Sequence, residues 1–192
     1  MNGKVKTVTA ENTPVETTRE FAVVKKSETT QGVKFDTDKP QMDLLPPRAT
    51  LLLLEEADFD QKLVLSKLFR FWESGKEKYL EEAIVELSDM CNDNFEGCVN
   101  TLEGVAQVLS FGAKKYAAHN WAKGIKLSRN FAATVRHLVK VAQGQDIDPE
   151  SGLHHYYHAL CDMFFMYETL SFKDVADWND RFKWEERCTN IL

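Results

Sequence analysis

The spacing of apolar and polar positions predicts helices along most of the chain from residue 47 onward. A run of leucines follows Pro46-Pro47, which is typical of a helix start. Residues 55–101 show two amphipathic helical patterns separated by Ser74-Gly75. Apolar side chains also recur at intervals of three and four in three longer stretches, residues 102–116, 128–143 and 150–169. The pattern predicts an all-α protein, a bundle of four or more helices.

The same pattern divides the chain into parts. Residues 1–31 have no helical periodicity and are expected to form a flexible N-terminal arm, within which Phe21-Ala22-Val23-Val24 is an alternative strand. Residues 32–170 form the main domain, interrupted by an acidic helical hairpin at 55–101 that we interpret as an insertion. Residues 171–192 carry four large aromatic side chains among charges and are expected to form a C-terminal helix or tail.

Side chains that can bind a metal recur every fourth residue in the last predicted helix, which holds three of the five histidines. If the helix starts at Pro149 with Asp148 as its cap, these side chains stack along one side. They are Glu150, His154, His158 and Asp162. Imidazoles and carboxylates in register are typical metal ligands, although a single histidine on a helix is more often a packing residue.

Basic side chains gather on the two preceding helices. Lys114 and Lys115 end the helix 102–116, where cations are favoured and can meet phosphates. The side of that helix opposite its apolar residues forms a polar stripe that begins at Glu103. Arg129, Arg136 and His137 share one side of the helix 128–143. That side is either a solvated basic face or a clamp for a triphosphate, since guanidinium groups bind phosphate oxygens in pairs.

Two loops have either a structural role or a role in ligand binding. Lys34, Asp36, Asp38 and Lys39 precede the first helix and belong either to an extended lead-in or to a loop over a polyanion. The stretch His119-Asn120-Trp121 lies in a short connection, where such residues are usually packing groups.

Composition narrows the range of partners. The chain has 192 residues, 43% of them apolar, and a formal charge of -6, which argues against stable binding to nucleic acid or to an anionic membrane. No apolar run reaches the roughly 20 residues that span a bilayer. The four cysteines lack CxxC spacing and the N-terminus lacks an apolar signal-peptide core, so we expect reduced thiols and a cytoplasmic protein.

Four motifs occur in order along the chain: KFDTDKPQMDLLPP, EGVAQVLSFGAKKYAAHNW, SRNFAATVRHL and DPESGLHHYYHALCD. Together they resemble a phage-borne family described as dATP/dGTP diphosphohydrolases, which is grouped with the all-α, MazG-like nucleoside triphosphate pyrophosphohydrolases. The resemblance implies cleavage between the α and β phosphates of a deoxynucleoside triphosphate. The positions that match are Lys34, Asp36, Lys39, Pro40, Lys115, Tyr116, Asn120, Trp121, Arg136, His137, Asp148, Glu150, His154, His158 and Asp162.

The chain departs from that family in two respects. Residues 55–101 interrupt a segment that is expected to be short. The paired ExxE and ExxD motifs of MazG-like enzymes are absent from the main domain, and Glu86-Leu87-Ser88-Asp89 fits ExxD only inside the hairpin. Either histidines replace carboxylates at the metal, or the protein binds nucleotides without hydrolysing them.

The favoured hypothesis is a metal-dependent pyrophosphohydrolase that cleaves purine deoxynucleoside triphosphates, with Mg²⁺ or Mn²⁺ as its cofactor. The protein is expected to act in the cytoplasm of a phage host and to form a homo-oligomer. Its predicted metal ligands are Glu103, Asp148, Glu150, His154, His158 and Asp162, and its catalytic residues are His137, Glu150 and His158. Its predicted substrate-binding residues are Lys34, Lys39, Lys114, Lys115, Tyr116, Asn120, Trp121, Arg129 and Arg136. The alternatives are an HD-like phosphohydrolase that releases phosphate or triphosphate, and a non-enzymatic protein that binds a nucleotide or a host factor.

Overall fold

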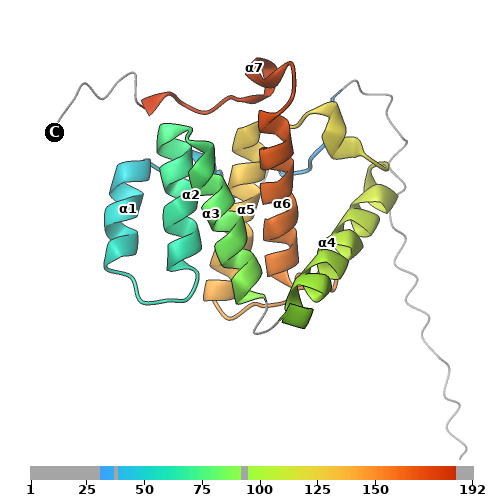
Figure 1. The fold of residues 1–192 in the computed structure, drawn as a ribbon, viewed down its shortest axis with the longest axis horizontal. Coiled ribbons are helices and arrows are strands. Elements are labelled where there is room, and N and C mark those ends of the chain that lie inside the picture. Colours follow the sequence, from blue (N-terminus) through green and yellow to red (C-terminus); the bar gives the residue numbers. More distant parts are fainter. Residues whose placement is uncertain (1–30, 37–38, 92–94, 185–192) are drawn as a thin grey trace, which may run out of the picture.

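Helices account for the regular structure of the described residues, apart from one isolated bridge between Ile147 and His154. The computed structural model describes residues 31–36, 39–91 and 95–184, so the predicted N-terminal arm up to residue 30, Asp38 and residues 185–192 lie outside it (Figure 1). The elements are η1 (Met42–Leu44), α1 (Pro47–Glu55), α2 (Lys62–Ser74), α3 (Glu77–Met90), α4 (Phe95–Lys115), η2 (Asn120–Lys123), α5 (Leu127–Ala142), α6 (His155–Leu170) and α7 (Val175–Trp178). The predicted all-α class is confirmed.

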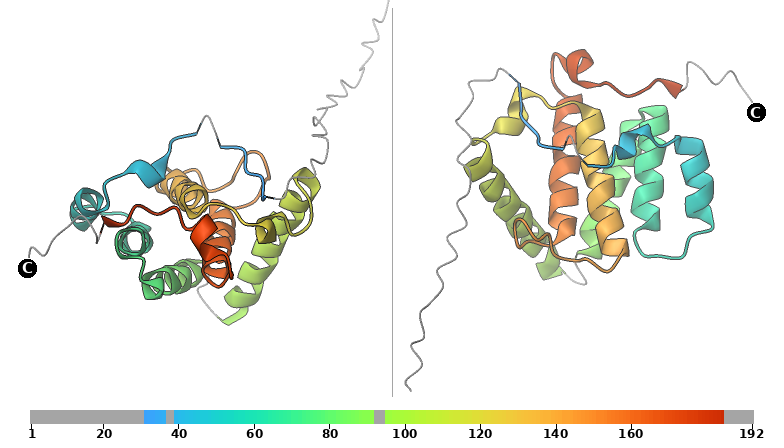
Figure 2. Two further views of the ribbon diagram at one scale, coloured as in Figure 1. Left: turned by 90° about the horizontal axis from the view of Figure 1, so that it is seen from above. Right: turned by 180° about the vertical axis from the view of Figure 1, so that it is seen from behind.

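Four helices form the centre of the bundle. α5 packs along α6, α2 packs along α3, and α3 joins the two pairs through its contacts with α6. α1 lies beside α2 at one edge, whereas α4 lies at the opposite edge and is inclined to the other helices (Figures 1 and 2). α4 therefore packs against one side of α6.

The predicted hairpin at 55–101 contains α2 and α3, and it is packed into the core. Trp72 of α2 stacks on Phe131 of α5 with ring centroids 4.3 Å apart, and Phe69 meets the same ring edge-on at 5.3 Å. Leu80 and Leu87 of α3 are completely buried. Leu63 of α2 faces solvent, at 52% exposure, although it fits the apolar pattern of that helix. The hairpin therefore supplies half of the central bundle.

Local sequence signals explain several helix ends. Pro46 is extended and Pro47 opens α1, as predicted, because a proline at the first helical position loses no intrahelical hydrogen bond. α2 ends at Gly75, which takes the left-handed conformation at φ 67°. α4 begins at Phe95, earlier than the predicted residue 102.

The C-terminal tail folds back over the bundle. Ser128, predicted as the cap of α5, instead donates through its backbone N–H and its hydroxyl to Asp180, while Lys126 takes the cap position. Arg181 donates to the carbonyl oxygen of Trp72 at 2.9 Å. Trp178 is 8% exposed. The tail therefore ties the ends of α2 and α5 together.

No helix in the described ranges is both long enough and apolar enough to cross a membrane. Cys91 and Cys161 are free thiols, and the side chains of Cys98 and Cys188 lie outside the described residues.

Replacing Trp72 by alanine is expected to reduce the free energy of unfolding by about 3–5 kcal/mol, because it removes the ring that joins α2 to α5. Chemical unfolding followed by circular dichroism measures the change. Leu53→Ala is the matched control, since Leu53 is 71% exposed on α1. An unchanged unfolding midpoint in Trp72→Ala would show that the hairpin is not part of the cooperative core.

Candidate active site

An extended segment lies across the bundle and forms one wall of the site. This leading segment comprises residues 32–36 with Lys39 and Pro40, and Figure 2 shows it in blue, crossing α6 and α5 in the view from behind. Asn120 fixes it by pairing with both backbone groups of Val33, at 3.1 and 3.0 Å. A Cβ at Gly32 would lie only 2.6 Å from Ile125, so only glycine fits this close approach.

Charged groups attach the leading segment to the helices below it. Lys34 donates to Asp162 of α6 and, at 3.0 Å, to Asn130 of α5. Arg129 of α5 forms an ion pair with Asp36 and donates to the carbonyl oxygen of Lys34. The Arg129 guanidinium therefore helps to lower the pKa of Asp36, although burial of that carboxyl opposes the shift. These contacts hold the Lys34 ammonium group between α5 and α6.

A cavity of about 730 Å³ opens beneath the leading segment, between α4, α5 and α6. Its described lining contains five lysine or arginine residues and four carboxylates, although the protein as a whole carries a charge of -6. The cations are Lys34, Lys39, Lys115, Arg136 and Lys140, and the carboxylates are Asp36, Asp148, Glu150 and Asp162. The cavity is therefore a locally basic site in an acidic protein.

Three imidazoles meet on one wall of this cavity and form a histidine cluster of His137, His155 and His158. The Nδ1 atoms of His137 and His155 lie 2.8 Å apart, and the rings of His137 and His158 stack at 4.9 Å. His158 Nε2 is 2.7 Å from the Ser151 hydroxyl. The cluster joins α5 to the first turn of α6.

A tight turn, rather than a helix, precedes α6. Asp148 Oδ1 accepts the backbone N–H groups of Glu150 and Ser151, both at 2.9 Å, and Gly152 takes φ 74°. The Leu153 carbonyl accepts the N–H of Asp148 at 2.8 Å, so the chain reverses before the helix begins at His155. The predicted helix start at Pro149 is wrong, because the Asp148 side chain satisfies those N–H groups in a turn.

Because α6 begins only at His155, two of the four predicted ligands are not part of the helix. Residues 155, 158 and 162 are three and four positions apart and point to the same side of α6. Glu150 and His154 are not helical, so the predicted four-residue line does not form. His154 instead caps the helix by accepting the N–H of Tyr156 at 3.1 Å. His155 is the site residue that the predicted ligand set lacks, and its spacing of three residues from His158 is the sequence signal that identifies it.

Most predicted site residues do line the cavity. They are Lys34, Lys39, Lys115, Tyr116, Asn120, Trp121, Arg136, His137, Asp148, Glu150, His158 and Asp162. Four others are absent from the lining: Glu103, Lys114, Arg129 and His154. Glu103 and Lys114 are on exposed positions of α4, and Glu103 accepts from Gln107 at 3.4 Å. Arg129 holds the leading segment, as described above.

One group of possible metal ligands is compact. One donor atom each from His137, Asp148 and His155 can be chosen so that all three lie within 4.8 Å of one another. Asp148 Oδ2 is 3.9 Å from His155 Nδ1, while its other oxygen is engaged in the turn. Glu150, Asp162 and His158 also line the cavity, but Lys115 pairs with Glu150 and Lys34 pairs with Asp162.

Burial keeps the histidine cluster uncharged. Burial, together with the neighbouring His158 and His155, lowers the pKa of His137 to about 2. Burial also lowers the pKa of His155 and of His158, despite the opposing effect of Asp148. Burial alone would raise the pKa of Asp148, but the N–H groups of Ser151 and Glu150 and the nearby His158 together lower it. Near pH 7 the site thus presents neutral imidazoles beside an ionised carboxylate.

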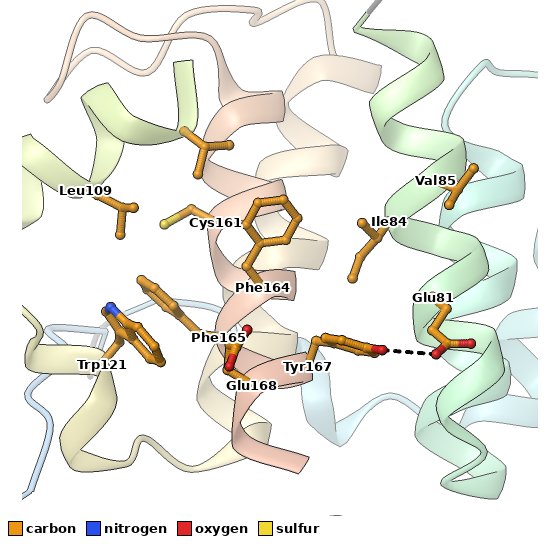
Figure 3. A pocket seen from close by; sticks show the side chains of 11 residues that line it. Glu81, Ile84, Val85, Leu109, Trp121, Cys161, Phe164, Phe165, Tyr167 and Glu168 are labelled. Carbon is orange, nitrogen blue, oxygen red and sulfur yellow. Dashed lines mark hydrogen bonds between the residues drawn. The ribbon is translucent and has the colours of Figure 1, made fainter. Parts of the chain in front are cut away.

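A second cavity, of about 480 Å³, lies between α3, α4 and α6 (Figure 3). Its lining is mostly apolar, and Tyr167 donates to Glu81 at 3.1 Å across it. Leu109, Trp121, Cys161 and Phe165 line both cavities. The described lining of the second cavity contains no lysine or arginine for a phosphate, so the basic cavity is the candidate active site.

The free energy of unfolding is expected to decrease below pH 6.5, because His137 stays neutral when folded but gains a proton in the unfolded chain. This stabilisation is complete above the unfolded pKa and is lost by up to about 1.4 kcal/mol per pH unit below it. Urea unfolding between pH 8 and 5, with EDTA present, measures the slope. His137→Gln should reduce the slope.

The control for this experiment is His119→Asn, since His119 is exposed and has a left-handed φ of 58° that asparagine tolerates. The control should retain the wild-type slope. Identical slopes in the wild type and His137→Gln would contradict the role of the buried imidazole.

Comparison with known proteins gives two matches. A family model described as dATP/dGTP diphosphohydrolase, N-terminal, matches residues 84–178. A protein named dATP/dGTP diphosphohydrolase from Salmonella phage PMBT28 is 37% identical over 75 residues, which are 39% of this chain and 26% of that protein. The chain thus spans about a quarter of that relative's length. No solved structure matches.

The family match contains α4, α5 and α6, and so includes the histidine cluster and most of the cavity wall. The leading segment lies outside the match. Residues 84–178, just under half of the chain, are therefore similar to the N-terminal part of the dATP/dGTP diphosphohydrolase family.

Proposed function

We propose that this protein is a metal-dependent pyrophosphohydrolase that converts purine deoxynucleoside triphosphates, dATP or dGTP, into the monophosphate and pyrophosphate. The observation that carries the proposal is the basic cavity, in which cations from the leading segment, α4 and α5 face the histidine cluster and Asp148. The family name and that of the phage relative support the substrate class.

The phosphates would be bound by cations from three elements. Lys34 comes from the leading segment, Lys115 from the end of α4 and Arg136 from α5. Arg136 donates to the Pro40 carbonyl at 2.7 Å, which fixes the guanidinium near the cavity. Lys115 pairs with Glu150, a half-exposed carboxylate that a phosphate can displace. Charge stabilisation of this kind is the main task of an enzyme in phosphoryl transfer.

The reaction requires a water molecule to attack the α phosphorus while the bond to the bridging oxygen breaks and pyrophosphate leaves. His158 is a suitable group to accept the proton from that water, since it is neutral near pH 7 and is oriented by Ser151. The Glu150 carboxylate is an alternative base within the same lining. His137 supports His158 by stacking against it.

The side chains also suit a divalent ion. Glu150 and Asp162 line the cavity with carboxylate oxygens, which are the ligands that Mg²⁺ and Mn²⁺ prefer. Such an ion, carried with the triphosphate, would neutralise its charge and lower the pKa of the attacking water.

The purine base would be held by aromatic side chains. Phe35 stacks on Tyr116 at 5.6 Å, and Trp121 stacks on Phe165 at 5.5 Å, all within the lining. Asn120 is occupied by the Val33 backbone, so its part is to position the leading segment rather than to read the base. Stacking favours a large purine ring over a pyrimidine.

The proposed enzyme would act in the host cytoplasm as a homo-oligomer. The charge of -6 supports free action on nucleotides in the host cytoplasm, without stable binding to nucleic acid. Exposed apolar side chains on α3 and α4, among them Val85, Val99 and Leu102, support assembly into a homo-oligomer.

Incubation with each deoxynucleoside triphosphate and Mg²⁺ or Mn²⁺ is expected to yield the monophosphate and pyrophosphate, with dATP or dGTP cleaved faster than dCTP or dTTP. Chromatography of the nucleotide products and a pyrophosphate assay measure the outcome. Release of triphosphate or of single phosphates would instead favour the HD-like reaction. Nucleotide binding with no product from any substrate would favour a binding protein.

Replacing Lys115 by methionine is expected to decrease kcat/KM by about 10- to 100-fold, which corresponds to the loss of one charge-assisted hydrogen bond to phosphate. Lys114→Met is the matched control, because Lys114 is the adjacent residue and lies outside the cavity lining. Its kcat/KM should stay within about twofold of the wild-type value. Equal losses in the two variants would point to a general charge effect and against a phosphate contact at Lys115.

A further inference from the structure

Two imidazoles and one carboxylate converge from three separate parts of the chain. His137 comes from the middle of α5, His155 from the first turn of α6 and Asp148 from the turn between them. Their donor atoms lie within 4.8 Å of one another. Two neutral nitrogen ligands and one carboxylate oxygen form a donor set that suits first-row transition ions, whereas Mg²⁺ strongly prefers oxygen.

The spacing of the three donors is close to that of a metal centre. Ligands about 2.0–2.2 Å from a tetrahedral ion are about 3.3–3.6 Å from each other. The two Nδ1 atoms, at 2.8 Å, would separate by about half an ångström, and Asp148 Oδ2, at 3.9 Å from His155 Nδ1, would approach by a similar distance. The third pair, Asp148 with His137, lies within 4.8 Å and would approach by at most about 1.5 Å.

The turn prepares Asp148 for this role. Its Oδ1 atom accepts two backbone N–H groups, which fixes the carboxylate and leaves Oδ2 on the side of His155. His155 is itself fixed, because its backbone N–H donates to the Asp146 carbonyl at 2.7 Å and its side chain is buried. Hydrogen bonds that hold a ligand from behind are a regular feature of metal sites.

The site is also open on one side. All three residues line the basic cavity, so coordination positions that the protein does not fill would face its interior. Three protein ligands with an open position are typical of catalytic metal sites, whereas structural sites use four.

We infer that His137, Asp148 and His155 bind one divalent transition ion of the Zn²⁺, Mn²⁺ or Fe²⁺ class as a resident ion of the folded protein. The inference goes beyond the proposed function, because this ion binds in the absence of a nucleotide and is separate from any Mg²⁺ that accompanies the phosphates. A histidine pair joined only by a hydrogen bond is the competing interpretation, and the experiment below distinguishes the two.

The experiment uses the full chain, stripped with EDTA and dialysed. Titration with Co²⁺ is expected to reach one equivalent per chain and to produce visible absorption bands, and excess Zn²⁺ should remove them. Millimolar Mg²⁺ should not compete. Absence of saturable binding of both Co²⁺ and Zn²⁺ below about 100 μM would overturn the inference, because a site with three protein ligands binds more tightly than that.

Substitutions test which residues are ligands. Asp148→Asn and His155→Gln should each weaken Co²⁺ binding on the order of 100-fold. Asp148→Asn retains an oxygen for the turn, so it serves even if His155→Gln does not fold. His154→Gln is the matched control, because His154 is adjacent in sequence but outside the site, and it should bind Co²⁺ like the wild type.

Circular dichroism of the metal-free variants establishes whether each is folded. Equal Co²⁺ affinity in Asp148→Asn and the wild type would overturn the assignment. None of these readouts uses a nucleotide, so a failure of the metal site and a failure of the proposed hydrolysis are seen separately.

Discussion

The candidate active site depends on one interaction, the acceptance of two backbone N–H groups by Asp148 Oδ1. These bonds stabilise a turn where an aspartate followed by proline can equally begin a helix. Because of the turn, α6 begins at His155, and His155, His158 and Asp162 face the cavity together. A helix that began at Pro149 would still place residues 155, 158 and 162 on one side. In such a helix, however, Glu150 and His154 would be helical residues and Asp148 would be the N-cap. The turn instead places the Asp148 carboxylate against the histidine cluster.

The leading segment completes the cavity from a distant part of the chain. Lys34 is 128 residues away in sequence from Asp162, yet their ion pair is one of the most buried in the described residues. A buried lysine needs such a partner, because an unpaired ammonium in a partly buried position is costly. Asn120 and Arg129 hold the backbone on either side of Lys34. Arg129 and Asn120 are therefore required for the shape of the site, because they hold the leading segment in place.

The helices could be predicted from sequence more readily than the site. Apolar periodicity located α2, α3, α5 and most of α6, and Pro47 and Gly75 marked two helix ends, since these signals are local. The contribution of the hairpin to the core could not be predicted in this way, because the stacking of Trp72 on Phe131 depends on tertiary packing. The cations of the cavity were largely identified, since Lys34, Lys115 and Arg136 occur in recognisable motifs. His155 was missed, although it precedes His158 by three residues and so lies on the same side of the helix. His154 was wrongly included, because its ring caps the helix and does not line the cavity.

The charges in the cavity indicate how a bound metal ion would favour the binding of a triphosphate there. The five cations of the described lining are opposed by four carboxylates, and two of the cations, Lys34 and Lys115, are already paired. The basic groups alone therefore leave only a small excess of positive charge for a highly charged anion. A divalent ion at His137, Asp148 and His155 would add two positive charges without adding a protein carboxylate, since neutral imidazoles supply two of its three ligands. With such an ion bound, histidine in place of carboxylate at this position would make the cavity more favourable for a polyphosphate.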